Sequence, residues 1–130
     1  MNQRSRGIIA VLLAGVWINA SEFFRNEVLL KPYWIEHYKS LGMTFPSEPI
    51  NGIFWMLWGF LYAVAIFFMS RTSSLLKTTL IGWLTGFVLM WIVIMNLGVL
   101  PLAILPFAVP LSLLEAFVGA YICIKTAPNE

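Results

Sequence analysis

One uncharged stretch constrains the fold of this chain more than any other feature. Residues 78 to 114 form 37 consecutive positions without a charged side chain, and nine further uncharged residues separate Glu115 from Lys125. A helix needs about 20 apolar residues to cross the hydrocarbon core of a bilayer. The stretch is therefore long enough for two crossings, and Glu115 falls inside the second, where a charge is costly.

The composition agrees with a chain that is solvated by lipid. Hydrophobic residues make up 60% of the 130 positions and charged residues 11%, against about 25% charged residues in an ordinary soluble domain. At this length we expect a single membrane domain, residues 1–130, without a separate soluble domain. The net charge of +2 comes without a clustered basic patch, so we expect the lipid bilayer and not nucleic acid as a partner.

Four apolar segments predict an all-α polytopic membrane protein, a bundle of four transmembrane helices. We expect the spans at about residues 7–28, 50–69, 78–96 and 100–124. Each is long enough for about 30 Å of hydrocarbon at about 1.5 Å per residue. Asn96, Gly98 and Pro101 favour a tight turn between the last two helices, since Asn and Gly suit turns and proline suits a first helical turn.

The positions of Lys and Arg predict the orientation of the bundle. Cations lie before the first span, between the second and third spans, and after the fourth: Arg4, Arg6, Arg71, Lys77 and Lys125. The positive-inside rule then places both termini in the cytoplasm, and we expect the inner membrane of a bacterium. A cleaved signal peptide is the minor alternative, because Ile18 stands where cleavage prefers a small residue.

The first loop predicts a short interfacial helix at about residues 33–41. Trp34 and Tyr38 recur there at helical spacing. Tyr and Trp prefer the level of the lipid headgroups, so Tyr33, Trp34 and Tyr38 are expected to anchor this helix at the outer surface. An aromatic lid over a ligand is the alternative. His37 has no second His or Cys to complete a metal site, and we predict no metal and no cofactor.

Small residues mark the faces on which helices approach one another. The predicted packing residues are Gly82, Gly86, Ser112 and Gly119. We expect these faces to pack within the bundle, in a homo-oligomer or against a larger membrane complex.

Polar side chains on the inner faces of the spans form the candidate site. Its predicted members are Glu115, Asn19, Glu22, Asn51 and Asn96. Because Asn19 lies at a depth similar to that of Glu115, we expect a hydrogen bond between their side chains. The residues near the outer surface, with Asn26 among them, are expected to line an outward-facing polar pocket floored by Asn19.

No basic residue is expected deep in any span, which leaves Glu115 without an obvious cationic partner. Arg25 is expected to pair with Glu22, three residues earlier, or to reach the outer headgroups. Desolvation then favours a neutral, hydrogen-bonded carboxylic acid at Glu115, and a reversible proton or cation site is the alternative. Pro106 and Pro110 predict a bent segment nearby, because an internal proline removes a helical hydrogen bond.

The order of features resembles uncharacterised families of small bacterial four-helix membrane proteins. A basic tail is followed by a span that ends in polar residues, by an aromatic segment at Tyr33, Trp34, Leu41 and Gly42, and by three closely spaced spans. The resemblance covers nearly the whole chain. It implies the architecture only, and no functional residue is carried over from it.

Three classes of function are compatible with the sequence. The leading interpretation is a noncatalytic helix-packing, accessory or assembly component, in which the polar residues are structural. The alternative is an oligomeric translocator of a small solute, a proton or an ion that uses Glu115, with Glu22 as a second candidate carboxylate. A lipid-modifying enzyme ranks last, because no Ser, His and Asp constellation and no metal-ligand set is present, and we predict that the chain is not an enzyme.

Overall fold

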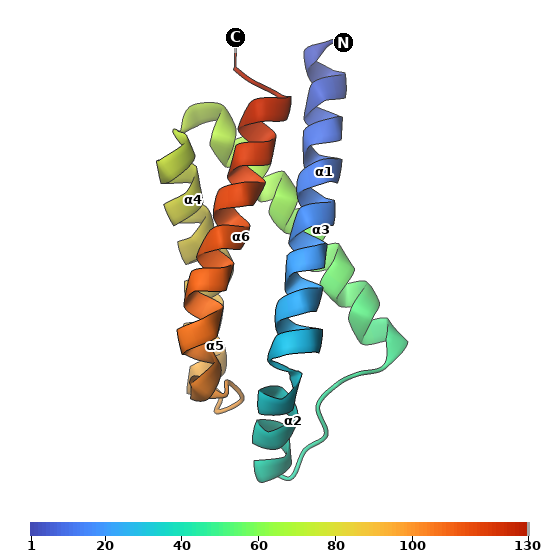
Figure 1. Ribbon diagram of the computed structural model, residues 1–130, viewed down its shortest axis with the longest axis vertical. Coiled ribbons are helices and arrows are strands. Elements are labelled where there is room, and N and C mark those ends of the chain that lie inside the picture. Colours follow the sequence, from blue (N-terminus) through green and yellow to red (C-terminus); the bar gives the residue numbers. More distant parts are fainter. Residues whose placement is uncertain (130) are drawn as a thin grey trace.

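The computed structural model describes residues 1–129, and within them the regular structure is entirely helical. Four helices are long and apolar enough to cross a membrane. They pack as an all-α four-helix bundle (Figure 1), which confirms the predicted fold class.

Each of the four predicted spans corresponds to one long helical segment. The first is α1 (Gln3–Phe23) with the π-helical turn η1 (Phe24–Leu29), and the second is α3 (Pro49–Thr72). The third is α4 (Leu75–Trp83), the π-helical turn η2 (Leu84–Val88) and α5 (Leu89–Asn96). The fourth is η3 (Leu102–Ile104) and α6 (Leu105–Thr126), and the first loop contains α2 (Lys31–Ser40). The first segment extends furthest beyond its predicted bounds, by four residues at Gln3, and the second and third segments each extend by three, at Thr72 and Leu75.

Side-chain caps explain where several of these helices begin. Asn2 Oδ1 accepts a hydrogen bond from the Ser5 N–H at 2.8 Å, and Ser74 caps α4 in the same way. At the start of α3, Glu48 and Asn51 form a reciprocal capping box. Caps of this type satisfy backbone N–H groups that have no partner within the helix.

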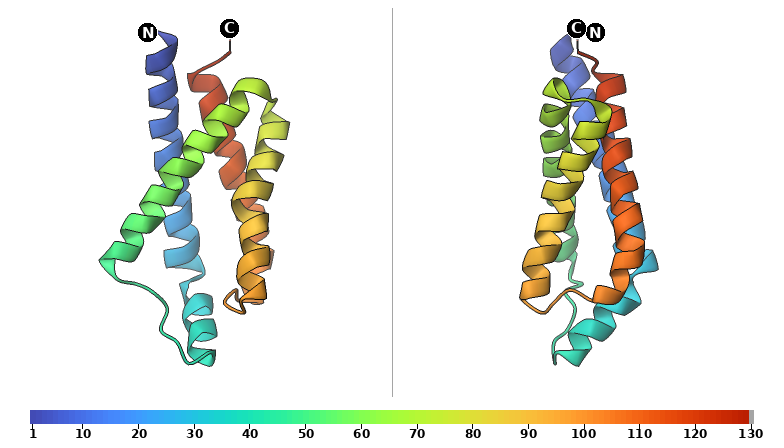
Figure 2. Two further views of the ribbon diagram at one scale, coloured as in Figure 1. Left: turned by 180° about the vertical axis from the view of Figure 1, so that it is seen from behind. Right: turned by 90° about the vertical axis from the view of Figure 1, so that its left-hand side faces the viewer.

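The helices are arranged so that both termini lie at one end of the bundle. The segments α1 and α6 run side by side, while α3 crosses the bundle at a steep angle and stands away from the others where it begins (Figure 2). The connection between α2 and α3 returns along the far end.

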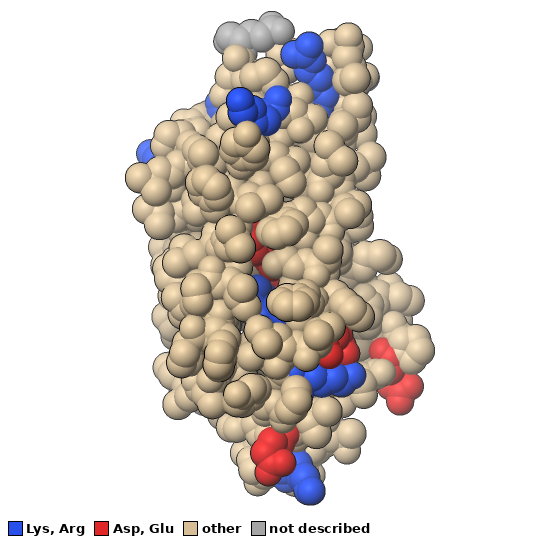
Figure 3. Space-filling view, in the orientation of Figure 1, with Lys and Arg blue, Asp and Glu red and all other residues tan. Residues whose placement is uncertain are grey.

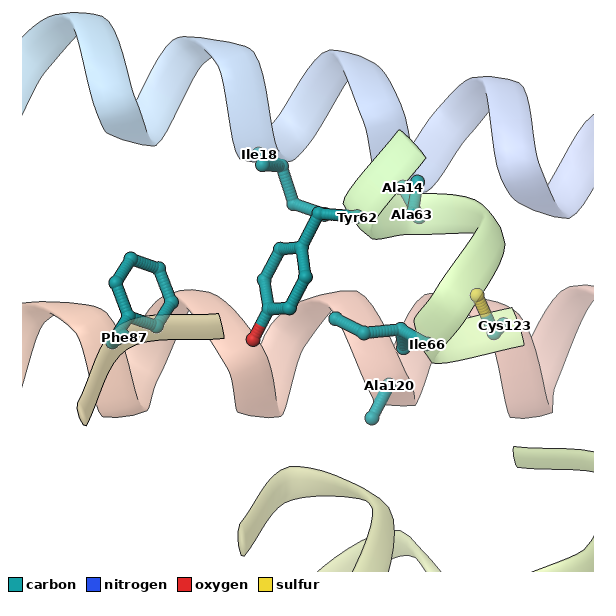
Figure 4. Packing of buried hydrophobic residues seen from close by; sticks show 8 residues of the cluster. All are labelled: Ala14, Ile18, Tyr62, Ala63, Ile66, Phe87, Ala120 and Cys123. Carbon is teal, nitrogen blue, oxygen red and sulfur yellow. The ribbon is translucent and has the colours of Figure 1, made fainter. Parts of the chain in front are cut away.

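The core forms where α1, α3 and α6 cross, beside η2 (Figure 4). Small residues, among them Ala14, Ala63 and Ala120, let the backbones approach, and the Tyr62 ring fills the space between helices. The Tyr62 hydroxyl donates a hydrogen bond to the Gly82 carbonyl at 2.7 Å. Phe87 packs edge-on against Tyr62 at 5.5 Å between ring centroids.

The predicted glycine faces are used inside this chain. Gly82 and Gly86 both lie against Tyr62, and Gly119 lies against Ile18 and Ile66. The face containing Gly82 and Gly86 is therefore already covered by α3. Packing of this face against a second copy or a larger complex stays a prediction.

The prolines of the fourth segment do not interrupt its helix α6. Pro101 precedes η3, and Pro106 lies in the first turn of α6, where a missing backbone N–H removes no helical bond. Only Pro110 lies inside α6, which continues without interruption from Leu105 to Thr126.

Ser112 supplies a test of the packing between α4 and α6. Its hydroxyl is fully buried and accepts a hydrogen bond from Trp83 Nε1–H at 2.9 Å. We expect Ser112→Ala to lower the free energy of unfolding by about 1 kcal/mol, because the indole N–H loses its partner. Thr85→Ala is the control, since this exposed hydroxyl bonds only to its own helix. Equal stability of the two variants in thermal unfolding would contradict a stabilising hydrogen bond between Trp83 and Ser112.

Candidate functional site

A buried ionic cluster of three residues connects the first and last helices. Arg25 Nη2 lies 2.6 Å from Glu22 Oε1, and Arg25 Nη1 lies 3.1 Å from Glu115 Oε1. The side chains of Glu22 and Arg25 are each 6% exposed, and that of Glu115 is 0% exposed. One guanidinium is therefore shared by two carboxyl groups inside the bundle, and we call Glu22, Arg25 and Glu115 the ionic cluster.

This cluster corrects two predictions about Glu115. Arg25 is its cationic partner, although the sequence indicated none. The Asn19 amide donates instead to the Gly15 carbonyl of its own helix at 2.9 Å, so the expected hydrogen bond between Asn19 and Glu115 is wrong. The expected pairing of Arg25 with Glu22 is present, but the guanidinium points into the bundle and not toward the surface.

The local backbone explains how Arg25 reaches the interior. Arg25 lies in η1, where the Leu30 N–H bonds to the Arg25 carbonyl, five residues earlier, at 2.8 Å. This wider turn changes the direction of the side chains that follow α1, and π-helical turns are frequent at functional sites. The guanidinium carbon lies 5.1 Å from the centroid of the Phe87 ring, which belongs to η2. The two π-helical turns thus contact each other through Arg25 and Phe87.

The two carboxyl groups of the cluster differ in their remaining contacts. Glu22 Oε2 accepts a hydrogen bond from Asn26 Nδ2 at 3.0 Å, so both of its oxygens have donors. Glu115 Oε2 is buried and has no hydrogen-bond partner among residues 1–129. The cluster therefore has one unsatisfied carboxyl oxygen, at a position midway along α6.

A cavity of about 400 Å³ borders the cluster at the end of the bundle away from the termini. Glu22 and Arg25 form part of its wall, while Glu115 does not line it and contacts Arg25. Its aromatic wall comprises Trp34, Tyr38, Phe45, Phe54, Trp55, Trp58 and Trp91. An apolar cavity of this size with a few convergent polar groups is typical of a small-molecule site.

A second cavity, of about 550 Å³, shares Glu22, Asn51 and Trp55 with the first. Asn19 lines this second cavity, as does Glu48 at the start of α3. The two cavities together correspond to the polar pocket expected from the sequence, with Glu22, Asn26 and Asn51 on their shared wall. Asn96, which was expected there, is exposed and lines neither cavity.

The helix of the first loop covers the first cavity. Trp34 stacks on Phe45 at 5.7 Å, Tyr38 meets Phe45 edge-on at 5.2 Å, and Trp34 Nε1–H donates to Asn26 Oδ1 at 3.2 Å. Trp34 and Tyr38 thus form part of the cavity wall. An aromatic lid, the alternative prediction for the first loop, requires this position. Tyr33 points elsewhere and packs near Phe107, at 6.3 Å between ring centroids.

The lid helix is also fixed to the turn between the last two helices. His37 Nε2 lies within hydrogen-bond distance of the Gly98 carbonyl, at 2.8 Å. Gly98 has φ +79°, a left-handed conformation that glycine adopts without strain. This contact joins α2 to the turn between α5 and η3.

No protein-family model, no curated protein and no solved structure matches this chain. The relationship to uncharacterised four-helix membrane families therefore stays a prediction. Within residues 1–129, no three His, Cys, Asp or Glu side chains are grouped as a metal site would require. The chemistry of the site follows from its own geometry, which combines aromatic faces with buried carboxyl groups.

Proposed function

We propose that the chain is an integral membrane protein with both termini in the cytoplasm, in the inner membrane of a bacterium. The four apolar helices support this placement, and so does the distribution of charge. On the face drawn in Figure 3, the charged atoms at the end that holds the termini are basic, those at the opposite end are mixed, and the middle shows only small acidic and basic patches. The positive-inside rule then assigns the basic end to the cytoplasm.

The cavity on the outward half of this protein is proposed to bind a small organic cation. The observation that carries this function is the position of the ionic cluster on an aromatic wall. Aromatic faces attract cations, most strongly at Trp. The cluster offers two carboxyl groups against one guanidinium, so it has the capacity to balance one further positive charge. A cation with an apolar part fits both features.

Cation binding makes translocation of a small solute the favoured function of the chain. A role as an assembly component becomes the alternative. The assembly interpretation relied on the face of Gly82 and Gly86, and that face is occupied by Tyr62 within the chain. The polar residues of the first span, by contrast, converge on a cavity. The lipid-modifying enzyme remains the least supported class.

Phenyltrimethylammonium is a suitable probe, because its charge is fixed and its ring is small enough for the cavity. We expect it to bind protein in lipid nanodiscs in equilibrium dialysis, and its uncharged carbon analogue tert-butylbenzene to bind at least tenfold more weakly. Trp55→Leu removes an aromatic wall shared by both cavities. This variant is expected to weaken binding by about tenfold, the equivalent of about 1.4 kcal/mol of cation–π attraction.

Phe68→Leu is the matched control on the same helix. Phe68 is 66% exposed and lies outside both cavities, so its replacement should leave the affinity unchanged. Equal affinity for the cation and the neutral analogue would contradict the proposal, as would equal losses in the Trp55 and Phe68 variants.

A further inference from the structure

The ionic cluster does not balance its own charge if both carboxyl groups are ionised. Glu22 and Glu115 would carry two negative charges against the single positive charge of Arg25. All three side chains are at least 94% buried, and an uncompensated charge in such surroundings is expensive. A further positive charge is therefore required, either a proton on one carboxyl group or a bound cation.

Neighbouring elements do not supply that charge. The third helical segment has no charged residue between positions 78 and 96, and α6 contributes only Glu115 at this depth. From α3, the Tyr62 hydroxyl donates to Gly82 and not to the cluster. The nearby Lys31 of α2 is paired with Glu27 at 2.7 Å.

The remaining titratable groups near the cluster do not pair with it: Tyr38 lines the first cavity, and Glu36 and Lys39 are exposed. His37 bonds to the Gly98 carbonyl, and Glu48 lines the second cavity beyond the cluster. The fully buried Glu115 keeps one oxygen without a donor among the described residues. Protonation of this oxygen neutralises the Glu115 carboxyl group, so it is a position where the missing positive charge can be held.

We infer that the ionic cluster holds one proton when the cavity is empty and releases it when an organic cation binds. The O–H bond of the protonated carboxyl group breaks, its electron pair stays on the carboxylate, and the proton passes through the cavity to water. The fixed charge of the ligand then replaces the proton. The net charge of the site is the same before and after exchange.

This inference rests on the proposed function for its ligand, but the resting proton can be tested without any ligand. Infrared spectra of wild type and Glu115→Gln in nanodiscs at pH 7 should differ by the C=O stretching band of one buried carboxylic acid. Glu22→Gln should lose the same band, because either variant leaves one carboxylate for Arg25. A wild-type spectrum without such a band would overturn the inference even if the cation binds.

Proton release is measured by calorimetry of phenyltrimethylammonium binding in two buffers of different ionisation enthalpy. We expect about one proton released per cation bound, and an affinity that rises by about tenfold per pH unit over the lower part of the range from pH 5 to 9. Glu115→Gln and Glu22→Gln should both make the affinity independent of pH, and either variant suffices if the other fails to fold. Glu27→Gln, which removes an outer carboxyl group of the same cavity, should keep the slope.

The possible failures of the two proposals are distinct. Absence of cation binding at every pH would contradict the proposed function. If the wild type bound the cation without releasing a proton, and with an affinity independent of pH, the proposed function would stand. The inferred exchange of a proton for the cation would then be overturned. A slope that is lost in Glu27→Gln but kept in Glu115→Gln would also overturn it, since the proton would then belong to a group outside the cluster.

Discussion

Arg25→Met is expected to lower the free energy of unfolding by about 3 to 5 kcal/mol, the largest effect of any single substitution considered for this chain. The guanidinium makes hydrogen bonds to both Glu22 and Glu115. Its removal leaves a buried carboxylate without a partner, and breaking a buried ion pair in this way typically has a cost of that size. Thermal unfolding in nanodiscs measures the change.

The loss in Arg25→Met should also depend on pH in a defined direction. Protonation removes the negative charge from the orphaned carboxyl groups, so the variant should be closest to wild type at pH 5 and furthest from it at pH 8. Lys31→Met is the control, because it breaks a partly exposed ion pair with Glu27, whose side chains are 32% and 35% exposed, and surface pairs contribute about 0 to 1 kcal/mol. Equal stability of the two variants would show that the ionic cluster contributes no more to the free energy of unfolding than the ion pair of Lys31 and Glu27.

Gly86→Ala is expected to lower the free energy of unfolding by about 1 to 3 kcal/mol. A Cβ at this position would lie 2.5 Å from Tyr62 Cε1 and 2.9 Å from its hydroxyl oxygen. Tyr62 has little room to retreat, since it stacks on Trp58 at 5.0 Å between ring centroids and bonds to Gly82. Overpacking a filled core typically has a cost of this magnitude.

Gly52→Ala is the matched control for the glycine substitution. Gly52 lies in the first turns of α3, and a Cβ there would meet nothing within 4 Å. Alanine favours a helix over glycine by up to about 1 kcal/mol, so this variant should be as stable as wild type or more so. If Gly86→Ala also raised the midpoint of thermal unfolding, the close contact between η2 and the Tyr62 ring would be wrong.

The helices could be predicted because the signals for them are local. The run from residue 78 to 114 contains no charge, and a turn is indicated near Gly98, whose observed φ of +79° agrees. Length and hydropathy are sufficient to identify such segments. The helix starts were less accurate, because the caps at Asn2 and Ser74 begin the first and third spans at Gln3 and Leu75 and not at residues 7 and 78.

The ionic cluster could be predicted only in part, because it joins residues 90 positions apart. Regular α-helical geometry assigns Arg25 to Glu22 or to the surface. The π-helical turn η1 then directs the guanidinium toward Glu115, and nothing in the local sequence identifies that turn. The sequence did contain one indication of the partner. A charge as deep as that of Glu115 is costly without an opposite charge, and Arg25 is the closest cation along the first span.

The cavity, too, could be predicted from the sequence only in part. Its polar wall was indicated by Glu22, Asn26 and Asn51, which occur at helical spacing near the ends of their spans. Its aromatic wall depends on the path of the connection between α2 and α3, which places Phe45 on Trp34. Such a connection has no periodic pattern, so the sequence could not predict the contact of Phe45 with Trp34, and the role of Trp34 and Tyr38 as anchors at the headgroup level stays a prediction.

The occupancy of the cavity by an organic cation is tested most directly by the tryptophans. Four of the six tryptophans line the first cavity, namely Trp34, Trp55, Trp58 and Trp91, while Trp17 and Trp83 do not. Fluorine NMR of protein labelled with 5-fluorotryptophan, in nanodiscs with and without phenyltrimethylammonium, reports on all six at once. We predict that the resonances of the four cavity tryptophans shift and saturate together, while those of Trp17 and Trp83 stay in place. No shift, or equal shifts at all six positions, would contradict binding in this cavity.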